Sequence, residues 1–148
     1  MVADRPDLAA MLAPLVRALI AIEQPILDTN DLTIWGYTVL LRLDDSPTRT
    51  QAALAQSIGA DKTRIIRVLD DLTERGYILR KPDPSDRRAH LISLTPAGRE
   101  VRDRAQVEIQ RREEVVLAAL PAGERRSFLR ALQQLSRSVE ADGPSGRE

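Results

Sequence analysis

The chain has 148 residues, of which 43% are apolar and 30% charged, and its 22 Lys and Arg side chains balance 22 Asp and Glu. This composition is too polar for a membrane protein and too apolar for a disordered one, so we expect one globular domain spanning residues 1–148. With no cysteine and one histidine, the sequence excludes disulfides and thiolate metal sites and predicts neither a metal nor a cofactor.

The amino-terminal residues indicate where in the cell the protein is expected. The first residues lack the basic start and apolar run of a secretory signal. Charge and proline interrupt the apolar stretch at 6–22, which argues against a membrane span. We therefore expect a cytoplasmic protein without a membrane partner.

The same stretch predicts an amphipathic helix over about 8–28, because apolar residues recur at steps of three and four. Pro14 and Pro25 lie inside this pattern. Proline removes a backbone donor and clashes with the preceding turn, so we expect the helix to start or kink at Pro14 and to end or kink at Pro25.

The middle of the chain combines three helix caps with a hairpin pattern. The expected caps and helices are Thr33 before 34–44, Thr50 before 51–57, and Asp61 before 62–75. Gly59 allows the tight turn of a helix-turn-helix between the second and third of these helices. Apolar runs at 77–81 and 89–94 flank a turn at 82–88, which predicts a β-hairpin with a basic tip.

Towards the carboxyl end, Thr95 and Pro96 open a charged helix that is expected to reach about Leu120, and a last helix follows the break at 121–123. We expect the tail at 141–148 to be disordered. The apolar stripes at the two ends of the chain have no sheet to pack on. We expect them to pack on one another and partly against a second copy in a two-fold homodimer; the alternative is a monomer folded over one core.

Charge is unevenly distributed along the chain. Residues 47–99 carry ten basic and six acidic side chains, whereas residues 1–46 carry three basic and seven acidic ones. A local basic excess is typical of a surface that binds a polyanion, although a solvated face of mixed charge has the same composition. The middle third is therefore the candidate site for a nucleic acid.

The helix after Asp61 has its charges in an unusual order. Its basic residues Lys62, Arg64 and Arg67 precede its acidic residues Asp70, Asp71 and Glu74. The helix dipole favours the reverse order. Insertion of the first turns into a DNA major groove, with Thr63 and Arg67 opposite the apolar stripe, explains the inversion. The alternative is an ordinary solvated helix face.

The hairpin tip supplies a second basic element. Asp86 precedes Arg88 by two residues, and we expect its carboxylate to orient the guanidinium by a charge-assisted hydrogen bond. An arginine held on a protruding ribbon suits a narrow, A·T-rich minor groove. On its own the pair is an ordinary surface feature, and its place directly after a helix-turn-helix is what favours the DNA contact.

Five motifs follow in order: TQAALA at 50–55, the turn at Gly59, DKT at 61–63 with LTERGYI at 72–78, DPSDRR at 83–88, and LTPAG at 94–98. Together they resemble the winged helix-turn-helix of MarR-type (multiple antibiotic resistance regulator) transcription factors. The flanking helices and the break at 120–125 extend the resemblance over nearly the whole chain. It implies a mainly α fold with a small β-hairpin wing (α+β), with a winged helix-turn-helix at 33–99 between dimerisation helices at 8–30 and 100–140.

The resemblance also implies a function and the residues that carry it. A homodimer would place two winged domains on successive major grooves of a pseudo-palindromic operator, usually as a repressor. The implied contacts are base edges for Thr63 and Arg67, bases or phosphates for Lys62 and Arg64, the minor groove for Arg88 oriented by Asp86, and phosphates for Arg87 and Thr50.

Regulation is the part of this function that the residues define least. Many MarR-type relatives bind small aromatic or phenolic anions in a crevice, and others respond through an oxidisable cysteine, which this chain lacks. Trp35 and Tyr37 are candidates to line such a crevice, and Arg17 is a candidate to pair with an anion. The alternative for each is ordinary core packing or a surface charge.

Two other functions remain open at this point. An enzyme would have to use a carboxylate pair, 44–45 or 70–71, but neighbours in a helix point about 100° apart and no nucleophile or phosphate loop accompanies them. A sequence-neutral architectural DNA binder would share the basic hairpin and the dimer but would have no preferred operator. We favour a sequence-specific regulator, because arginine and threonine can read bases.

Overall fold

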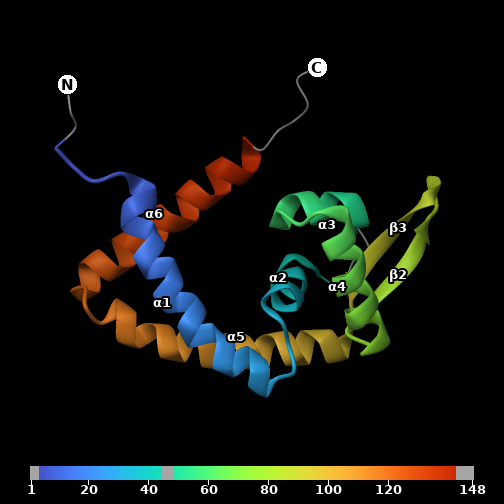
Figure 1. Cartoon of the computed structure of the whole chain (residues 1–148), viewed down its shortest axis with the longest axis horizontal. Helices are drawn as coiled ribbons and strands as arrows, with labels where there is room; N and C mark the ends of the chain where they lie inside the picture. The colour runs from blue at the N-terminus through green and yellow to red at the C-terminus, as the bar shows by residue number, and fades with distance from the viewer. Residues whose placement is uncertain (1–3, 45–48, 143–148) are drawn as a thin grey trace. The chain divides into compact units, whose positions relative to one another are not determined.

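The computed structural model describes residues 4–44 and 49–142, and the chain divides into two compact units, Met1–Gln110 and Arg111–Glu148. The helices and strands, labelled in Figure 1, are α1 (Leu8–Thr29), α2 (Ile34–Arg42), β1 (Arg49–Thr50), α3 (Gln51–Ile58), α4 (Lys62–Glu74), β2 (Ile78–Asp83), β3 (Asp86–Leu94), α5 (Pro96–Leu117) and α6 (Ala122–Ala141). A mainly helical fold with a small antiparallel sheet is thereby confirmed. Most of the tail at 141–148 lies outside the described residues.

Helix α1 runs unbroken through Pro14 and Pro25, so it neither starts at Pro14 nor ends at Pro25. Both prolines are exposed, as are the residues one turn before them, so the carbonyls that lose a donor face the surface. By length and composition alone, α1 also qualifies as able to cross a membrane, with a mean hydropathy of 1.5, so interruption of the stretch does not exclude a span. Its last turn packs into the core of the first unit through Ile26 and Leu27.

The predicted caps are confirmed. The hydroxyls of Thr33, Thr50 and Thr95 accept hydrogen bonds from the backbone N–H groups of Gly36 (2.9 Å), Ala53 (3.1 Å) and Gly98 (3.0 Å), and the Asp61 carboxylate accepts one from Arg64 (2.7 Å). Gly59 and Gly76 have left-handed φ angles of 71° and 75°. These two positions favour glycine because other residues pay a steric cost there.

The sheet differs from the prediction in two ways. Strands β2 and β3 pair from Ile78 and Leu94 to Asp83 and Asp86, so the turn is much shorter than the expected 82–88. Pro82 is tolerated inside β2 because the strand order β1-β3-β2 makes β2 an edge. The second difference is β1, whose two residues pair with β3 and are too few to produce a periodic pattern.

The core of the first unit joins α1, α2, α3, α4, the sheet and the first half of α5. Its fully buried members include Leu27, Leu40, Leu54, Leu69, Ile92 and Ala105. Leu69 comes from the apolar stripe of α4, and Leu54 from the helix before the turn. The helix-turn-helix and the hairpin are thus held on one continuous core, which fixes the outward face of α4.

In the second unit, α6 has no buried residue within the described part of the chain. In the single chain its apolar stripe is exposed: Leu132 by 39%, Leu135 by 57% and Val139 by 70%. An ion pair of 2.8 Å between Arg125 and Glu114 joins the start of α6 to the end of α5. Packing of the two terminal helices on each other and on a second copy stays a prediction.

The start of α5 is fastened to the loop between α4 and β2. Besides capping α5, the Thr95 hydroxyl donates a hydrogen bond of 2.6 Å to the Gly76 carbonyl, and the Thr95 N–H donates to the Tyr77 carbonyl at 3.1 Å. A Cβ at Gly98 would overlap that same Tyr77 carbonyl oxygen. Gly98 therefore permits the close approach of helix and loop.

We expect Gly98→Ala to lower the free energy of unfolding by about 1–3 kcal/mol, the usual cost of overpacking, because the obstructing atom belongs to the backbone. The matched control is Gly123→Ala in α6, where a Cβ meets no described atom within 4 Å. Urea unfolding of both variants checks this. Equal stability of Gly98→Ala and the unchanged protein would refute the close approach.

Candidate nucleic-acid interface

Helix α4 presents its polar residues because its opposite face is anchored. Ile65, Leu69 and Leu72 are buried, with exposures of 1%, 0% and 1%. Residues three and four apart share a helix face, so these three fix the rotation of α4 about its own axis. The structure accordingly leaves four predicted site residues exposed: Lys62, Thr63, Arg64 and Arg67.

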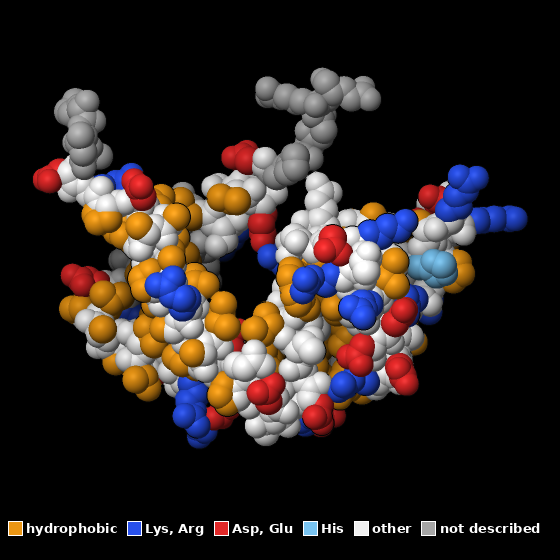
Figure 2. Space-filling view, in the orientation of Figure 1, with side chains coloured by type: hydrophobic (Ala, Val, Ile, Leu, Met, Phe, Trp, Pro, Cys, Tyr) orange, Lys and Arg blue, Asp and Glu red, His pale blue; other side chains and the backbone are white. Residues whose placement is uncertain are grey.

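The acidic end of α4 is paired with arginines. Asp71 forms an ion pair of 3.1 Å with Arg75, and Asp70 forms one of 2.6 Å with Arg80 of β2. These two carboxylates are therefore paired, whereas Lys62, Arg64 and Arg67 form no ion pair within residues 4–44 and 49–142. Figure 2 shows Lys and Arg side chains reaching outward at the hairpin tip.

Arg80 is a site residue that the sequence did not single out. Its Nε donates to the Thr73 hydroxyl at 3.0 Å, and its terminal nitrogen meets Asp70. Both partners lie on α4, so Arg80 fastens the hairpin to this helix. The only signal in the sequence is a basic residue at an inward position of a half-buried strand.

The hairpin tip is shaped by two aspartates. The Asp83 carboxylate accepts hydrogen bonds from the backbone N–H (2.9 Å) and the hydroxyl (2.8 Å) of Ser85. These bonds stabilise the charged form and hold the pKa of Asp83 below its ordinary value. The charged carboxylate is thus stabilised in the same hairpin that carries Arg87 and Arg88.

Asp86 does not orient the Arg88 guanidinium, contrary to the expectation. Its Oδ1 accepts a hydrogen bond of 3.0 Å from the backbone N–H of Arg88. An aspartate carboxylate readily accepts a hydrogen bond from the backbone N–H two residues later, because this local turn costs little conformational entropy. Bonding the guanidinium would require the long arginine side chain to be ordered as well. Arg87 and Arg88 are exposed and form no ion pair within residues 4–44 and 49–142.

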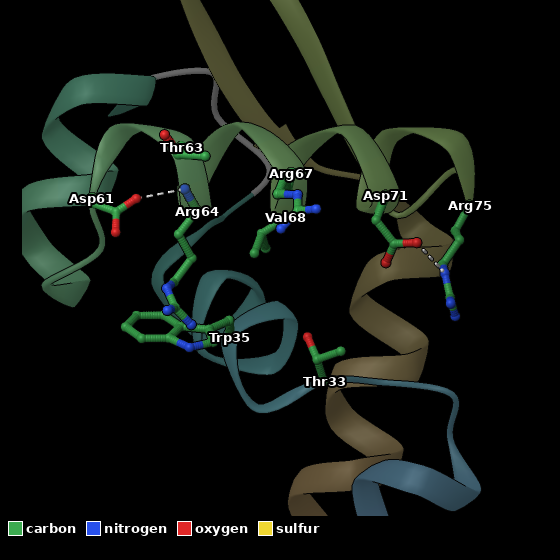
Figure 3. Close-up of a pocket in the computed structure, with 9 residues that line it drawn as sticks. All are labelled: Thr33, Trp35, Asp61, Thr63, Arg64, Arg67, Val68, Asp71 and Arg75. Carbon is green, nitrogen blue, oxygen red and sulfur yellow. Dashed lines mark hydrogen bonds and ion pairs between the residues drawn. The ribbon is translucent and has the colours of Figure 1, made fainter.

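An open pocket of about 520 Å³ lies between α4 and the start of α2. Figure 3 shows Trp35 of α2 beneath the side chain of Arg64, whose guanidinium carbon is 4.9 Å from the ring centroid. The remaining lining residues are Thr33, Asp61, Thr63, Arg67, Val68, Asp71 and Arg75. The pocket thus offers one aromatic ring and three arginines.

The three residues predicted to bind a ligand are not brought together. Trp35 lines the pocket, but Tyr37 is buried in the core with 6% exposure, and Arg17 is exposed on α1. Residues two apart in a helix point about 160° away from each other, which explains why Trp35 and Tyr37 separate. The sequence analysis did not assign Arg64 and Arg67 to a ligand pocket, because the same residues were already assigned to DNA contacts.

The remaining observations bear on other functions. Thr50, the predicted phosphate contact, is half-buried and uses its hydroxyl to cap α3. Among the described residues, no three His, Cys, Asp or Glu side chains gather as metal ligands. The carboxylates at 70–71, considered for an enzyme, are engaged by arginines, and Asp45 lies outside the described residues.

Comparisons with known proteins agree with this geometry. A family model described as the MarR family matches residues 32–90. A putative transcriptional regulatory protein for the hcr operon of Thauera aromatica is 29% identical over 81% of this chain and 72% of its own length. The segment matched by the family model runs from just before α2 into β3.

Two solved structures extend the similarity over most of the chain. The PcaV transcriptional regulator of Streptomyces coelicolor, in complex with its natural ligand, is 30% identical, with 94% of this chain and 99% of that chain covered and a TM-score of 0.65. The transcriptional repressor CouR of Rhodococcus jostii, bound to a 23-mer DNA duplex, is 29% identical, with 88% and 92% covered and a TM-score of 0.75.

Proposed function

Because this chain belongs to the MarR family, we propose that it is a cytoplasmic, sequence-specific DNA-binding regulator that acts as a homodimeric repressor of a pseudo-palindromic operator. The observation that carries this proposal is the charge order of α4. Its exposed first turns are basic, its buried stripe fixes their direction, and two of the three acidic residues at its end, Asp70 and Asp71, are paired with arginines. A recognition helix reads base edges with its early residues, which is the end that this helix leaves free.

Within this function, Thr63 and Arg67 are the base-reading pair. Both are exposed and lie about 40° apart around α4, opposite the buried stripe. An arginine can donate two hydrogen bonds to guanine, and a threonine can bond a base edge or contact a thymine methyl group. Lys62 and Arg64 flank this pair and meet bases or phosphates.

The wing supplies the second contact with DNA. Arg88 enters the minor groove, where a narrow A·T-rich sequence concentrates negative potential, and Arg87 meets phosphate. Asp86 shapes the backbone at Arg88 and so acts on its direction only indirectly. At the start of α3, backbone N–H groups next to Thr50 bind a further phosphate. The Thr50 hydroxyl does not take part, because it already caps the helix.

A homodimer gives the exposed apolar stripes a partner. Leu8, Val16 and Ile20 of α1 are 57%, 47% and 42% exposed, and α6 adds Leu135 and Val139. Apolar side chains gathered on one helix face mark an interface more often than scattered ones do. A two-fold dimer would also match the symmetry of a pseudo-palindromic operator.

Response to a small aromatic anion completes the proposal. The similar PcaV structure holds its natural ligand. In this chain the pocket at Trp35 offers a ring face for stacking and arginines for a carboxylate. Of the three ligand residues expected from the sequence, only Trp35 lines this pocket; Tyr37 is buried in the core, and Arg17 is not among the lining residues. We propose no enzymatic activity, since the similar proteins are named as transcriptional regulators.

Binding to DNA tests the proposal directly. On a labelled duplex from the region upstream of its own gene, fluorescence anisotropy should show a preference over a scrambled duplex of about 10³-fold or more. Titration should saturate at two subunits per duplex. Equal, steeply salt-dependent binding to both duplexes would instead indicate an architectural DNA binder, and no binding to either would refute the proposal.

Arg67→Ala should weaken binding to the preferred duplex by about 1–3 kcal/mol and relax the preference at one base position, because one bidentate base contact is lost. The same anisotropy assay on single-base variants of the duplex measures this. If operator and random DNA lose affinity equally, Arg67 reads no base.

Arg88→Ala should weaken binding most on duplexes with A·T-rich flanks, because a narrow minor groove attracts arginine most strongly. Duplexes that differ only in their flanks isolate this effect, and Arg87→Ala is the control, with a loss that does not depend on the flanks. A flank-independent loss for Arg88→Ala would place it on phosphate instead.

A further inference from the structure

We infer that Trp35 positions Arg64 as a contact to the DNA backbone at the edge of the recognition helix. The inference rests on the proposed function and deepens it, because the family resemblance leaves Arg64 open between bases and phosphates. Trp35 lies on α2, outside the helix-turn-helix pair itself, and would touch no DNA. In DNA binding it acts only through Arg64, which makes it a positioning residue for that contact.

The first step is that Trp35 is itself held in place. The Thr33 hydroxyl caps α2 on the N–H of Gly36, the residue after Trp35. Gly36 is buried against α4: a Cβ there would lie 3.6 Å from Leu72 and 3.1 Å from the Thr33 hydroxyl. Leu72 of α4 is thus at ordinary packing distance from this position, and the tight contact that the glycine accommodates is the one with its own cap, Thr33. The indole is therefore carried on a capped helix start that packs against α4.

The second step is that the Arg64 side chain rests on this indole. The guanidinium carbon lies 4.9 Å from the ring centroid, within the range of a cation–π contact. In the part of the chain that the structure describes, the guanidinium forms no ion pair or hydrogen bond of its own. Stacking restricts the long side chain while its N–H donors stay available to an incoming acceptor.

The third step concerns direction. Around α4, Arg64 lies about 60° from Arg67 on the side of α2. Figure 3 shows it reaching from the helix towards Trp35 and away from Thr63. When Thr63 and Arg67 face the floor of a major groove, a side chain turned this far aside meets the groove wall. The wall is sugar and phosphate, for which a planar, preorganised guanidinium is well suited.

Anisotropy titrations of the full-length protein over a salt series test the inference, on the upstream duplex and on a random-sequence duplex. Arg64→Ala should weaken both by the same factor and reduce the salt slope by about 0.9, the value for one phosphate contact. Trp35→Leu should weaken both by about two- to five-fold, the equivalent of one exposed cation–π contact. Trp35→Phe, which keeps a ring, should recover most of this loss.

Coupling between the two residues is the sharper readout. If Trp35 acts through Arg64, the double variant with Trp35→Leu and Arg64→Ala binds no more weakly than Arg64→Ala alone. Additive losses would overturn the inference, and so would a loss for Arg64→Ala confined to the upstream duplex, which would make Arg64 a base reader. Arg130→Ala, at an exposed arginine of α6, is the control for loss of one positive charge and should leave the salt slope unchanged.

A measurement without DNA separates this inference from the proposed function. Trp35 is the chain's one tryptophan, so its fluorescence reports on the stack alone. Quenching by neutral acrylamide should increase in Arg64→Ala, because one face of the indole loses its cover; unchanged quenching would overturn the stack. If the stack is present but the unchanged protein binds neither duplex, the proposed function fails and the DNA role of Arg64 fails with it.

Discussion

Burial of one face of α4 is the constraint on which the rest of the interface depends. Ile65, Leu69 and Leu72 have almost no exposed surface, and turning the helix by even one position would bring them into water. Burying a Leu or Ile side chain contributes about 1.5–3 kcal/mol, so such a rotation would cost several kilocalories per mole. An exposed ion pair at the surface of α4 contributes less free energy, about 0–1 kcal/mol. The direction of Thr63 and Arg67 is thus set by apolar side chains that never meet a ligand.

The polar contacts around α4 have a different task, which is to set the angles of its neighbours. Arg80 connects the hairpin to Thr73 and Asp70, and Thr95 connects α5 to the turn at Gly76. Exposed ion pairs are worth little individually, because solvent screens them. Their value here is geometric, since each one joins two elements that the core alone would allow to slide.

Local signals explain what the sequence predicted correctly. A cap needs only one side chain and a nearby N–H, and the turn at Gly59 needs only one residue with a left-handed φ, so Thr33, Thr50 and Asp61 marked their helices. Contacts between residues that are far apart in the sequence have no comparable local signal. Strand β1, the Arg80 contacts and the stack of Arg64 on Trp35 all depend on tertiary packing. Asp86 was misassigned because sequence spacing does not distinguish a guanidinium from a backbone N–H, and Tyr37 because a helix turns it away from Trp35.

The two-residue strand β1 has a mechanical consequence. Arg49 and Thr50 pair with Ile92 and Leu91 of β3, and Thr50 is also the cap of α3. The start of α3, the first helix of the helix-turn-helix, is therefore joined through β1 to the strand that carries the arginines of the wing. A displacement of β3 would pull directly on the start of α3. Strand β1 therefore couples the wing mechanically to the first helix of the helix-turn-helix.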